Sequence, residues 1–486
     1  MARTEPARGM RDFLPEDVRR RAHVIGIIAR VYERYGFEPL ETPAVENLET
    51  LLGKYGDEGN QLIFKILKRG EHEASGQADL ALRYDLTVPL ARVVAEYQSK
   101  LPKFFKRYQI QPVWRADRPA RGRFREFYQC DIDSVGSKSL LVEGELIAAA
   151  SEAMTSLGFG DFVIRLNHRG LLTLVLSFFF GLPESAHIEA LVALDKLDKI
   201  GWSEVLDELE TRQILSRSAS MQALKGINQF ADAEDTAHAA DSPSIRALRR
   251  YGTFLKRDPG SDITRLEELR EVFLRSPLKI DVSPVNDLIE ILELSRNTPA
   301  EGRLRHDIFL ARGLSYYTGA IMEIAVPDLA GSLGGGGRYD NLIGTFLGKE
   351  VPACGFSLGL ERILVVMDEG NMFPQELPNS GVDFVVVAHD QEALLAVKDL
   401  AHSLRELGQS VDLYPEPVAK FSELFKYLDY RGAKAVVGVR ASDVNTGTAT
   451  LRDLRTRTNE SLTVLALLDR VNEERNRNIN GRKNES

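Results

Sequence analysis

Two strand-like segments, Phe104–Trp114 and Phe124–Val135, are separated only by a short arginine-rich loop. So short a connection favours a hairpin, in which the two strands run antiparallel. The interval Lys103–Arg125 holds eight Lys and Arg residues and a single acid, Asp117. Because guanidinium groups match phosphate oxygens in geometry, a basic hairpin of this kind suits a polyphosphate or an RNA end. The alternative interpretation is a solvated loop whose arginines bind nothing in particular.

The overall charge and cysteine content exclude several classes of protein. The 486 residues carry a net charge of −9, so nucleic acid would have to bind to local patches. Cys130 and Cys354 cannot form a disulfide framework or a four-thiolate zinc site. The longest apolar run, Leu171–Leu182, is too short to span a bilayer, and Met1–Asp12 has no apolar segment of a secretory signal. We therefore expect a soluble, cytoplasmic, multidomain protein with no membrane partner.

The first 170 residues carry signals for both helices and strands. Glu16–Tyr35 repeats apolar residues at intervals of three and four, which predicts an amphipathic helix. Phe37–Val45 is strand-like but contains two prolines, which lack the N–H that a central strand needs. We therefore expect this segment at a sheet edge or an interface. Leu80–Tyr84 is a further expected strand, and Leu140–Leu157 is a further expected helix.

The pattern changes beyond residue 170. Residues 171–302 have helical periodicity and charge-rich turns, which predicts an α-rich insertion. Strand patterns return at Asp307–Arg312 and Ala320–Pro327, and the polar, proline-bearing stretch 371–380 is typical of a linker. The expected domains are 1–170 together with 303–370, the insertion 171–302, a C-terminal domain 381–470 and a polar, frayed tail 471–486.

The C-terminal region alternates short apolar strands with helices, which indicates a small α/β domain with a largely parallel sheet. The expected strands are Val382–Ala388, Ser410–Tyr414 and Ala433–Val439, and the expected helices are Gln391–Leu407 and Lys420–Tyr430.

Several common catalytic motifs are absent from the sequence. It contains no G-x-x-x-x-G-K-[ST], no H-E-x-x-H and no C-x-x-C, which argues against P-loop nucleotidases, zinc proteases and dithiol redox enzymes. The eight histidines form no pair at ligand spacing, and we expect His168 and His306 to be hydrogen-bonded structural residues. No metal site is expected from the protein alone.

Two glycine-bearing segments remain as candidates for a binding site. Gly334–Gly337 allows a close approach of the backbone, either to a ligand or to another strand. In Gly355–Arg362 the glycines lie in an expected strand-to-helix passage, so an anion would meet helix amides and Arg362 together. The alternative is a helix whose Glu361 and Arg362 simply face water.

Three separated blocks together resemble the class II aminoacyl-tRNA synthetases. They are the proline-bearing strand with Pro43 (motif 1), the strand–loop–strand block Trp114–Asp133 (motif 2) and the G-x-x-x-G-L-E-R entry Gly355–Arg362 (motif 3). The resemblance implies an α+β catalytic domain with an antiparallel sheet, together with a C-terminal α/β domain of the anticodon-binding type.

Further blocks narrow the resemblance to the histidyl-tRNA synthetase family. Arg312–Gly319 is similar to its R-G-L-D-Y-Y segment, and Gly336–Asp340 is similar to its G-G-R-Y-D segment. The segments Arg8–Phe13 and Leu82–Thr87 agree as well, so the resemblance extends from about Arg8 to Leu468. One departure is Ser315, which stands where the family usually has aspartate and carries no charge.

The resemblance implies ATP with Mg²⁺ as one substrate and catalysis by alignment and charge stabilisation, without a protein nucleophile. Arg115 and Arg312 are then the catalytic residues, which grip the α-phosphate and the carboxylate of histidine. Arg362 is expected at the γ-phosphate, Asp117 near the adenine and Arg123 also at ATP.

The resemblance also implies a pocket for L-histidine. Asp85, Thr87 and Gln129 would hold the ammonium, while Asp133 and Tyr317 would hold opposite sides of the imidazole. An acid and a hydroxyl across a ring reject apolar rivals by roughly 10⁴–10⁵, so no editing domain is expected. The full implied set of histidine-binding residues is Asp85, Leu86, Thr87, Arg115, Gln129, Asp133, Arg312, Tyr316, Tyr317 and Tyr339.

The expected macromolecular partners are tRNA(His) and a second copy of the chain. Arg118, Arg123 and Arg125 of the motif 2 loop would meet the acceptor end of the tRNA, and motif 1 implies a homodimer. In the C-terminal domain the candidates for phosphate contacts are Arg431, Lys434, Arg440, Arg452, Arg455 and Arg457, although a solvated face is an equal alternative for each of them.

Two kinds of non-catalytic relative are alternatives to the enzyme. The regulatory subunit of ATP phosphoribosyltransferase typically lacks the C-terminal α/β domain and loses pocket residues, whereas this chain keeps both. The uncharged-tRNA sensor of a stress kinase would require a kinase segment, which this sequence does not contain. A scaffold protein would not need arginines at all three of the positions that are expected to face the nucleotide.

Overall fold

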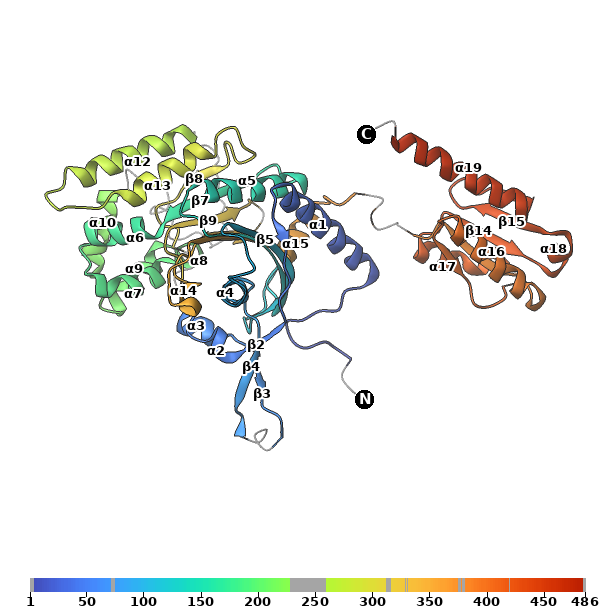
Figure 1. The fold of residues 1–486 in the computed structure, drawn as a ribbon, viewed down its shortest axis with the longest axis horizontal. Helices are drawn as coiled ribbons and strands as arrows, with labels where there is room; N and C mark the ends of the chain where they lie inside the picture. Colours follow the sequence, from blue (N-terminus) through green and yellow to red (C-terminus); the bar gives the residue numbers. More distant parts are fainter. Residues whose placement is uncertain are drawn as a thin grey trace. The chain divides into compact units, whose positions relative to one another are not determined.

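The computed structural model describes residues 4–70, 75–227, 259–311, 316–327, 329, 331–374, 377, 381–418 and 420–483 (Figure 1). The chain forms two compact units, residues 1–372 and 373–486, so the break falls inside the stretch that we expected to be a linker. Within the described residues no helix has both the length and the apolar character needed to cross a bilayer.

An eight-stranded sheet forms the centre of the first unit. Its inner neighbours pair antiparallel, as the α+β fold class requires, whereas the outermost pairs, β1–β5 and β7–β8, are parallel. The prolines behave as expected, because Pro39 lies in the edge strand. In spatial order the strands are β1 Glu38–Pro39, β5 Phe105–Trp114, β6 Glu126–Val135, β11 Ala353–Gly359, β10 Ser332–Arg338, β9 Ala320–Ala325, β7 Val163–His168 and β8 Leu304–His306.

Three helices cover one face of this sheet: α1 Pro15–Arg34, α5 Leu141–Ser156 and α15 Leu360–Glu369. The predicted amphipathic helix is α1, and it buries an apolar stripe that includes Val24 and Ile28. Because successive strand residues point to opposite faces, the alternate residues of β5, β6 and β11 are left for the other face.

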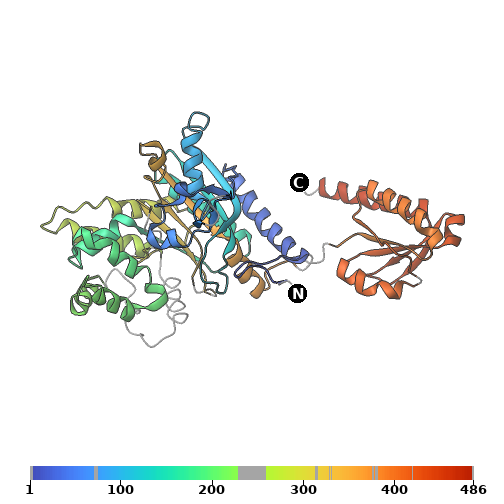
Figure 2. The same cartoon turned by 90° about the horizontal axis from the view of Figure 1, so that it is seen from below.

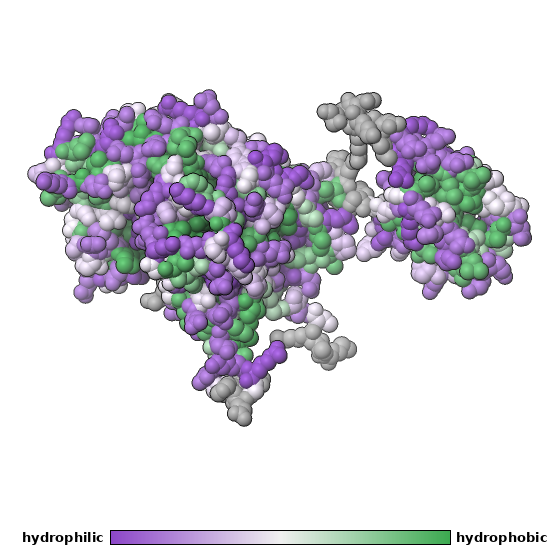
Figure 3. Space-filling view, viewed as in Figure 1, coloured by the Kyte–Doolittle hydropathy of each residue, from purple (hydrophilic) through white to green (hydrophobic). Residues whose placement is uncertain are grey.

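A small three-stranded sheet, β2–β4–β3, projects from the first unit (Figure 1). Its strands are β2 Val45–Asn47, β4 Ala78–Leu82 and β3 Lys65–Leu67, and the short helices α2 Leu48–Leu51, α3 Gly56–Gln61 and α4 Thr87–Glu96 follow or separate them. Apolar side chains are exposed on it, Leu67 by 53%, and Figure 3 shows apolar surface there. The expected strand Phe37–Val45 is therefore divided between two sheets.

Helices gather at the β7–β8 end of the large sheet in both Figure 1 and Figure 2. The described parts of the expected insertion, 171–227 and 259–302, contain helices and no strand. The helices are α6 Arg169–Phe178, α7 Glu184–Leu194, α8 Leu197–Ile200, α9 Trp202–Thr211, α10 Arg217–Ile227, α12 Pro259–Leu274 and α13 Ser283–Leu294, and the separate short helix α14 covers Gly344–Leu347.

The strand expected at Asp307–Arg312 is wrong for the described residues 307–311. The strand, β8, ends at His306, because the Asp307 carboxylate pairs with Arg165 and accepts a hydrogen bond from the Phe309 N–H at 3.2 Å, which turns the chain. A further strand, β7 Val163–His168, is buried on both faces and was not predicted from the sequence.

The second unit is a five-stranded sheet in the order β13–β12–β14–β15–β16. The first three strands are parallel, as expected, whereas β15 and β16 add an antiparallel hairpin that was not anticipated. The strands are β12 Phe384–Ala388, β13 Val411–Leu413, β14 Ala435–Val439, β15 Thr448–Asp453 and β16 Asn459–Thr463, and the helices are η3 Gln391–Ala393, α16 Leu394–Glu406, η4 Phe421–Leu424, α17 Phe425–Arg431, α18 Ala441–Thr446 and α19 Val464–Lys483.

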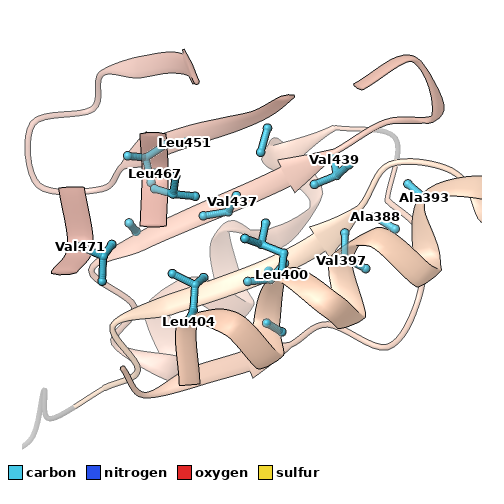
Figure 4. Close-up of a cluster of buried hydrophobic side chains, with 14 residues drawn as sticks. Ala388, Ala393, Val397, Leu400, Leu404, Val437, Val439, Leu451, Leu467 and Val471 are labelled. Carbon is cyan, nitrogen blue, oxygen red and sulfur yellow. The ribbon is translucent and has the colours of Figure 1, made fainter. Parts of the chain in front are cut away.

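The tail after residue 470 was expected to be frayed. This expectation is wrong for residues 471–483, because they belong to α19. Two kinds of contact stabilise this part of the helix. Val471 is 5% exposed and packs into the core between α16 and the sheet (Figure 4). Ion pairs one helical turn apart, such as Arg470 with Glu474, add local support.

Candidate active site

The open face of the large sheet is polar, which follows from the strand register. In β5, β6 and β11, three successive rows of paired residues point to this face. The rows are Arg107–Asp133–Gly355, Gln109–Asp131–Ser357 and Gln111–Gln129–Gly359. A sheet face with charged residues, amides and glycines instead of apolar residues is suited to binding a ligand rather than to packing a core.

A cleft of about 490 Å³ lies over this face. It brings together most of the site residues expected from the sequence, although they come from segments far apart in the chain. Those that line it are Asp85, Thr87, Arg115, Asp117, Arg123, Gln129, Asp133, Tyr316, Tyr317, Tyr339 and Arg362. Leu86 is fully buried, and its carbonyl accepts a hydrogen bond from Arg107 at 3.2 Å. Arg312 and Ser315 lie outside the described residues.

Asp133 is held rigidly at the base of the cleft. Its Oδ2 lies 2.7 Å from Nη2 of the fully buried Arg107, and its Oδ1 accepts a hydrogen bond from the Tyr339 hydroxyl. Burial raises the pKa of Asp133, and the Arg107 guanidinium opposes that rise. A side chain on Gly355 would overlap the Asp133 carboxylate, so this position of the expected motif requires glycine.

Asp85 provides a second buried carboxylate in the cleft, two residues before α4 begins. Its Oδ1 accepts hydrogen bonds at 3.0 Å from the Tyr55 hydroxyl and from the Val88 N–H. Burial raises the pKa of Asp85, while those hydrogen bonds and Arg115 oppose the rise. Tyr55 was missed because nothing in its local sequence links it to Asp85.

Arg115 is fixed along its stem and free at its tip. Its Nε donates to the Tyr84 carbonyl at 3.0 Å, and its guanidinium lies 4.4 Å from the Tyr84 ring centroid and 5.1 Å from that of Phe127. Within the described part of the chain its two terminal nitrogens have no partner. An arginine held in this way offers a planar pair of donors to a carboxylate or a phosphate.

The basic loop makes specific contacts of its own, so the alternative of a solvated loop is wrong for most of its arginines, whereas binding to phosphate stays a prediction. Arg123 pairs with Asp117 at 2.7 Å, and Arg125 Nε donates to the Asp117 carbonyl at 3.0 Å. Arg121 pairs with Glu369 of α15. Arg118 is exposed, and its side chain has no partner among the residues that the structure describes.

The N-terminal segment and α15 hold the hairpin in place. The Arg125 N–H donates to the Gly9 carbonyl at 2.8 Å, and Arg11 lies 3.4 Å from the centroid of the Phe124 ring. Glu361 does not face water, because it is 3% exposed and pairs with Arg21 of α1 at 2.8 Å.

Arg362 does not simply face water either, because it lines the cleft. Its Nη1 donates to the Ser332 carbonyl at 2.6 Å, and the loop residue Gly122 packs against its stem. Arg115 and Arg362 therefore line the same cleft from two distant parts of the sequence.

The glycine run forms β10, between β9 and β11, and it also lines the cleft. The close approach to another strand is therefore confirmed, and the approach to a ligand stays a prediction. A side chain at Gly336 would overlap the Gly355 carbonyl of β11, and one at Gly337 would meet the ring of Tyr317 at 3.0 Å.

Residues 355–359 also spell G-x-S-x-G, the pattern of serine-hydrolase nucleophiles. That pattern requires a serine on a sharp strand-to-helix turn, but Ser357 lies within β11 and its Oγ accepts a hydrogen bond from Gln129 Nε2 at 2.9 Å. None of the described residues that line the cleft is histidine. A hydrolase triad is therefore not assembled by these residues.

Asp131 is the cleft residue that sequence reasoning missed most clearly. It lies between Gln129 and Asp133 on the same face of β6, and it is 2% exposed. The alternation of polar residues along this strand was the signal that could have identified it. In the described part of the chain, no group of three or more His, Cys, Asp or Glu side chains is arranged to hold a metal ion.

An antiparallel sheet with a basic hairpin over its face, next to a strand that leads into an arginine-bearing helix, defines the catalytic domain of a class II aminoacyl-tRNA synthetase. The profile of the family described as "Histidyl-tRNA synthetase" matches residues 9–363. The chain belongs to the histidyl-tRNA synthetase family, which confirms the resemblance found in its motifs.

Curated relatives and solved structures agree with this assignment. The "Histidine--tRNA ligase" of Cytophaga hutchinsonii is 38% identical over 467 residues, which is 92% of this chain and 94% of the relative. That of Gloeobacter violaceus is 39% identical over 478 residues, 93% and 95% of the two chains. The crystal structure of the histidyl-tRNA synthetase from Nostoc sp. has a TM-score of 0.73 at 29% identity and covers 98% of this chain and 100% of that one.

A Bacillus halodurans chain described as an "ATP phosphoribosyltransferase regulatory subunit/histidyl-tRNA synthetase" has a TM-score of 0.66 at 21% identity. It covers 90% of this chain and 100% of that one. At this level of identity the likeness supports the fold alone.

Proposed function

We propose that this protein activates L-histidine with ATP to histidyl-adenylate and transfers the histidyl group to the 3′ end of tRNA(His). The observation that carries the proposal is a single cleft that combines fixed buried carboxylates, a tyrosine pair and the open guanidinium of Arg115. Family membership supports the same activity.

The first step requires alignment rather than a protein nucleophile. The carboxylate oxygen of histidine attacks the α-phosphorus of ATP, and pyrophosphate leaves. Arg115, whose two terminal nitrogens have no partner among the described residues, would hold the α-phosphate and the substrate carboxylate together, and Arg312 would share that task. Arg362, at the entry of α15, would bind the γ-phosphate. Such fixed donors stabilise charge as it develops, without reorganisation.

ATP would occupy the side of the cleft under the basic hairpin. Asp117 and Arg123 line this side as an ion pair, and they would border the adenine and the phosphates. Mg²⁺ enters as part of the ATP complex, bound mainly by phosphate oxygens, and neutralises their charge.

The imidazole would lie between Asp133 and Tyr317. Arg107 and Tyr339 fix the Asp133 carboxylate, so its orientation precedes binding. A buried acid and a hydroxyl that lose their partner in the presence of an apolar amino acid give discrimination of roughly 10⁴–10⁵. Asp85, Thr87 and Gln129 would hold the ammonium, and Leu86 would contribute through its backbone.

For tRNA, we propose that the basic hairpin meets the acceptor end and that the C-terminal unit binds elsewhere on the molecule. Arg118 is the best candidate in the hairpin, because it is exposed and uses no internal partner among the described residues, whereas Arg123 and Arg125 are partly committed. In the C-terminal unit, Arg431 and Lys434 already pair with aspartates. A homodimer and a cytoplasmic location complete the proposal, and both rest on the family.

ATP–pyrophosphate exchange measured with each of the twenty amino acids tests the activity. We expect exchange with histidine alone, and Arg312→Ala should lower it at least ~100-fold through loss of charge stabilisation. Charging of tRNA(His) transcripts then tests the second step. Absence of histidine-dependent exchange in the wild type would identify the chain as a non-catalytic relative.

A further inference from the structure

Asp131 has no role in the site proposed so far. It lies on β6 between Gln129, proposed to face the ammonium, and Asp133, proposed to face the imidazole. Its side chain is turned to the cleft and is 2% exposed. An acidic side chain in such a position affects the binding of any charged ligand.

Among the residues that the structure describes, Asp131 has no cation that it does not share with Asp133. The nearest is Arg107, whose Nη2 lies 3.9 Å from Asp131 Oδ2 but 2.7 Å from Asp133 Oδ2. Its other contacts are neutral: Gln129 Nε2 at 3.4 Å and a hydrogen bond with Ser357. A buried carboxylate without a close cation is costly, so it must gain either a proton or a cationic ligand.

The side-chain amide of Gln129, next to Asp131, indicates what kind of ligand would satisfy this carboxylate. Gln129 Oε1 is buried and has no hydrogen-bond donor among the residues that the structure describes. Gln129 Oε1 and the Asp131 carboxylate are therefore adjacent acceptors that lack a strong donor. A primary ammonium has three N–H donors, a positive charge and no acceptor, so it satisfies both groups at once. By contrast, the Asp133 carboxylate already has a close cation, Arg107 Nη2 at 2.7 Å, and a hydrogen bond from the Tyr339 hydroxyl.

We propose that Asp131 binds the α-ammonium of the amino-acid substrate together with Gln129 and Asp85, and that it gives up a proton when it does so. This assignment deepens the proposed function and rests on it. Asp131 is then a further substrate-binding residue, next to those that the family resemblance supplied.

The proton release follows from the groups around Asp131. The pKa of Asp131 is raised to about 7, chiefly by burial; Arg107 on β5 and the hydrogen bond with Ser357 oppose the rise, while Asp133 on β6 and Asp85 before α4 contribute to it. Tyr316 and Tyr317 also face this carboxylate, and burial raises the pKa of each, so they stay neutral. An ammonium favours the ionised carboxylate, so histidine affinity should increase as the pH rises through this range.

The test compares two ligands that differ only in the ammonium: L-histidine and imidazolepropionate, which keeps the imidazole and the carboxylate. The KM for histidine and the competitive Ki of imidazolepropionate are measured by pyrophosphate exchange. The proteins are full-length wild type, Asp131→Asn and Asp399→Asn, whose carboxylate is exposed in the C-terminal unit. We expect Asp131→Asn to raise the histidine KM on the order of 10- to 100-fold, because a charge-assisted contact is lost.

The Ki of imidazolepropionate should stay within about threefold of wild type in Asp131→Asn, since that contact does not exist for this ligand. Equal weakening of both ligands, or an unchanged histidine KM, would overturn the proposal. Asp399→Asn should match wild type throughout.

The pH dependence separates proton release from simple charge attraction. Free histidine also titrates near neutral pH, but this titration affects the KM of both proteins equally. The ratio of the Asp131→Asn KM to the wild-type KM therefore reports on Asp131 alone. This ratio should approach one at about pH 6 and increase toward pH 8. A ratio independent of pH would overturn proton release. Absence of wild-type exchange would instead refute the proposed function, so the two failures are distinguishable.

Discussion

Replacing Gly355 with alanine should disrupt the histidine pocket through a single methyl group. An added Cβ would overlap the Asp133 carboxylate. The backbone cannot retreat, because β11 is hydrogen-bonded to β6 on one side and to β10 on the other. The Asp133 side chain must therefore move away from Arg107, its partner at 2.7 Å.

The size of this effect follows from the burial of the pair. Arg107 is fully buried, and disrupting a buried ion pair costs about 3–5 kcal/mol. We expect Gly355→Ala to lower the unfolding free energy of the first unit by about that amount in chemical denaturation. The variant should also raise the histidine KM in pyrophosphate exchange at least ~100-fold, because a misplaced acid no longer meets the imidazole.

Gly359→Ala is the matched control for stability, because it lies on the same strand and its Cβ would meet nothing closer than the Leu333 carbonyl at 3.4 Å. Its unfolding free energy should stay within about 1 kcal/mol of wild type. If Gly355→Ala kept both wild-type stability and wild-type histidine KM, the account of a rigid Asp133 would be refuted.

Three further predictions follow from other contacts. Arg21→Met leaves Glu361 buried without its cation, so unfolding free energy should fall by about 3–5 kcal/mol, and adding Glu361→Gln should restore part of it; a double variant no more stable than Arg21→Met would contradict the pairing. Tyr317→Phe should raise the histidine KM roughly tenfold with the ATP KM unchanged, and equal histidine affinity would remove Tyr317 from the pocket. Truncation after Ser380 should spare pyrophosphate exchange yet depress charging of tRNA(His), and equal loss of both would indicate a structural role.

Features with a local physical signal were predictable from the sequence. The spacing of apolar residues predicted α1, the prolines predicted an edge strand at Pro39, and the strand–basic loop–strand pattern predicted the β5–β6 hairpin. The alternation of strands and helices after residue 381 predicted the parallel core of the second unit. In each case the determinant is the pattern of one continuous stretch of sequence, so contacts between distant segments were not needed.

Features that depend on distant contacts were missed. β7 is buried on both faces, because its polar residues Arg165 and Asn167 bind groups from distant segments that its own sequence does not reveal. The tail was expected to fray because it is polar, but Val471 anchors it in a core that its own sequence does not reveal. Asp131 is recognised as a site residue only from the strand register, and Tyr55 only from its hydrogen bond to Asp85.

The most direct test of the central claim is a crystal structure of the full chain with a non-hydrolysable histidyl-adenylate analogue. We expect the imidazole between Asp133 and Tyr317, the ammonium against Asp131 and Gln129, and the phosphate analogue at the tip of Arg115. An analogue bound away from the open face of β5, β6 and β11, or an imidazole directed away from Asp133, would contradict the account.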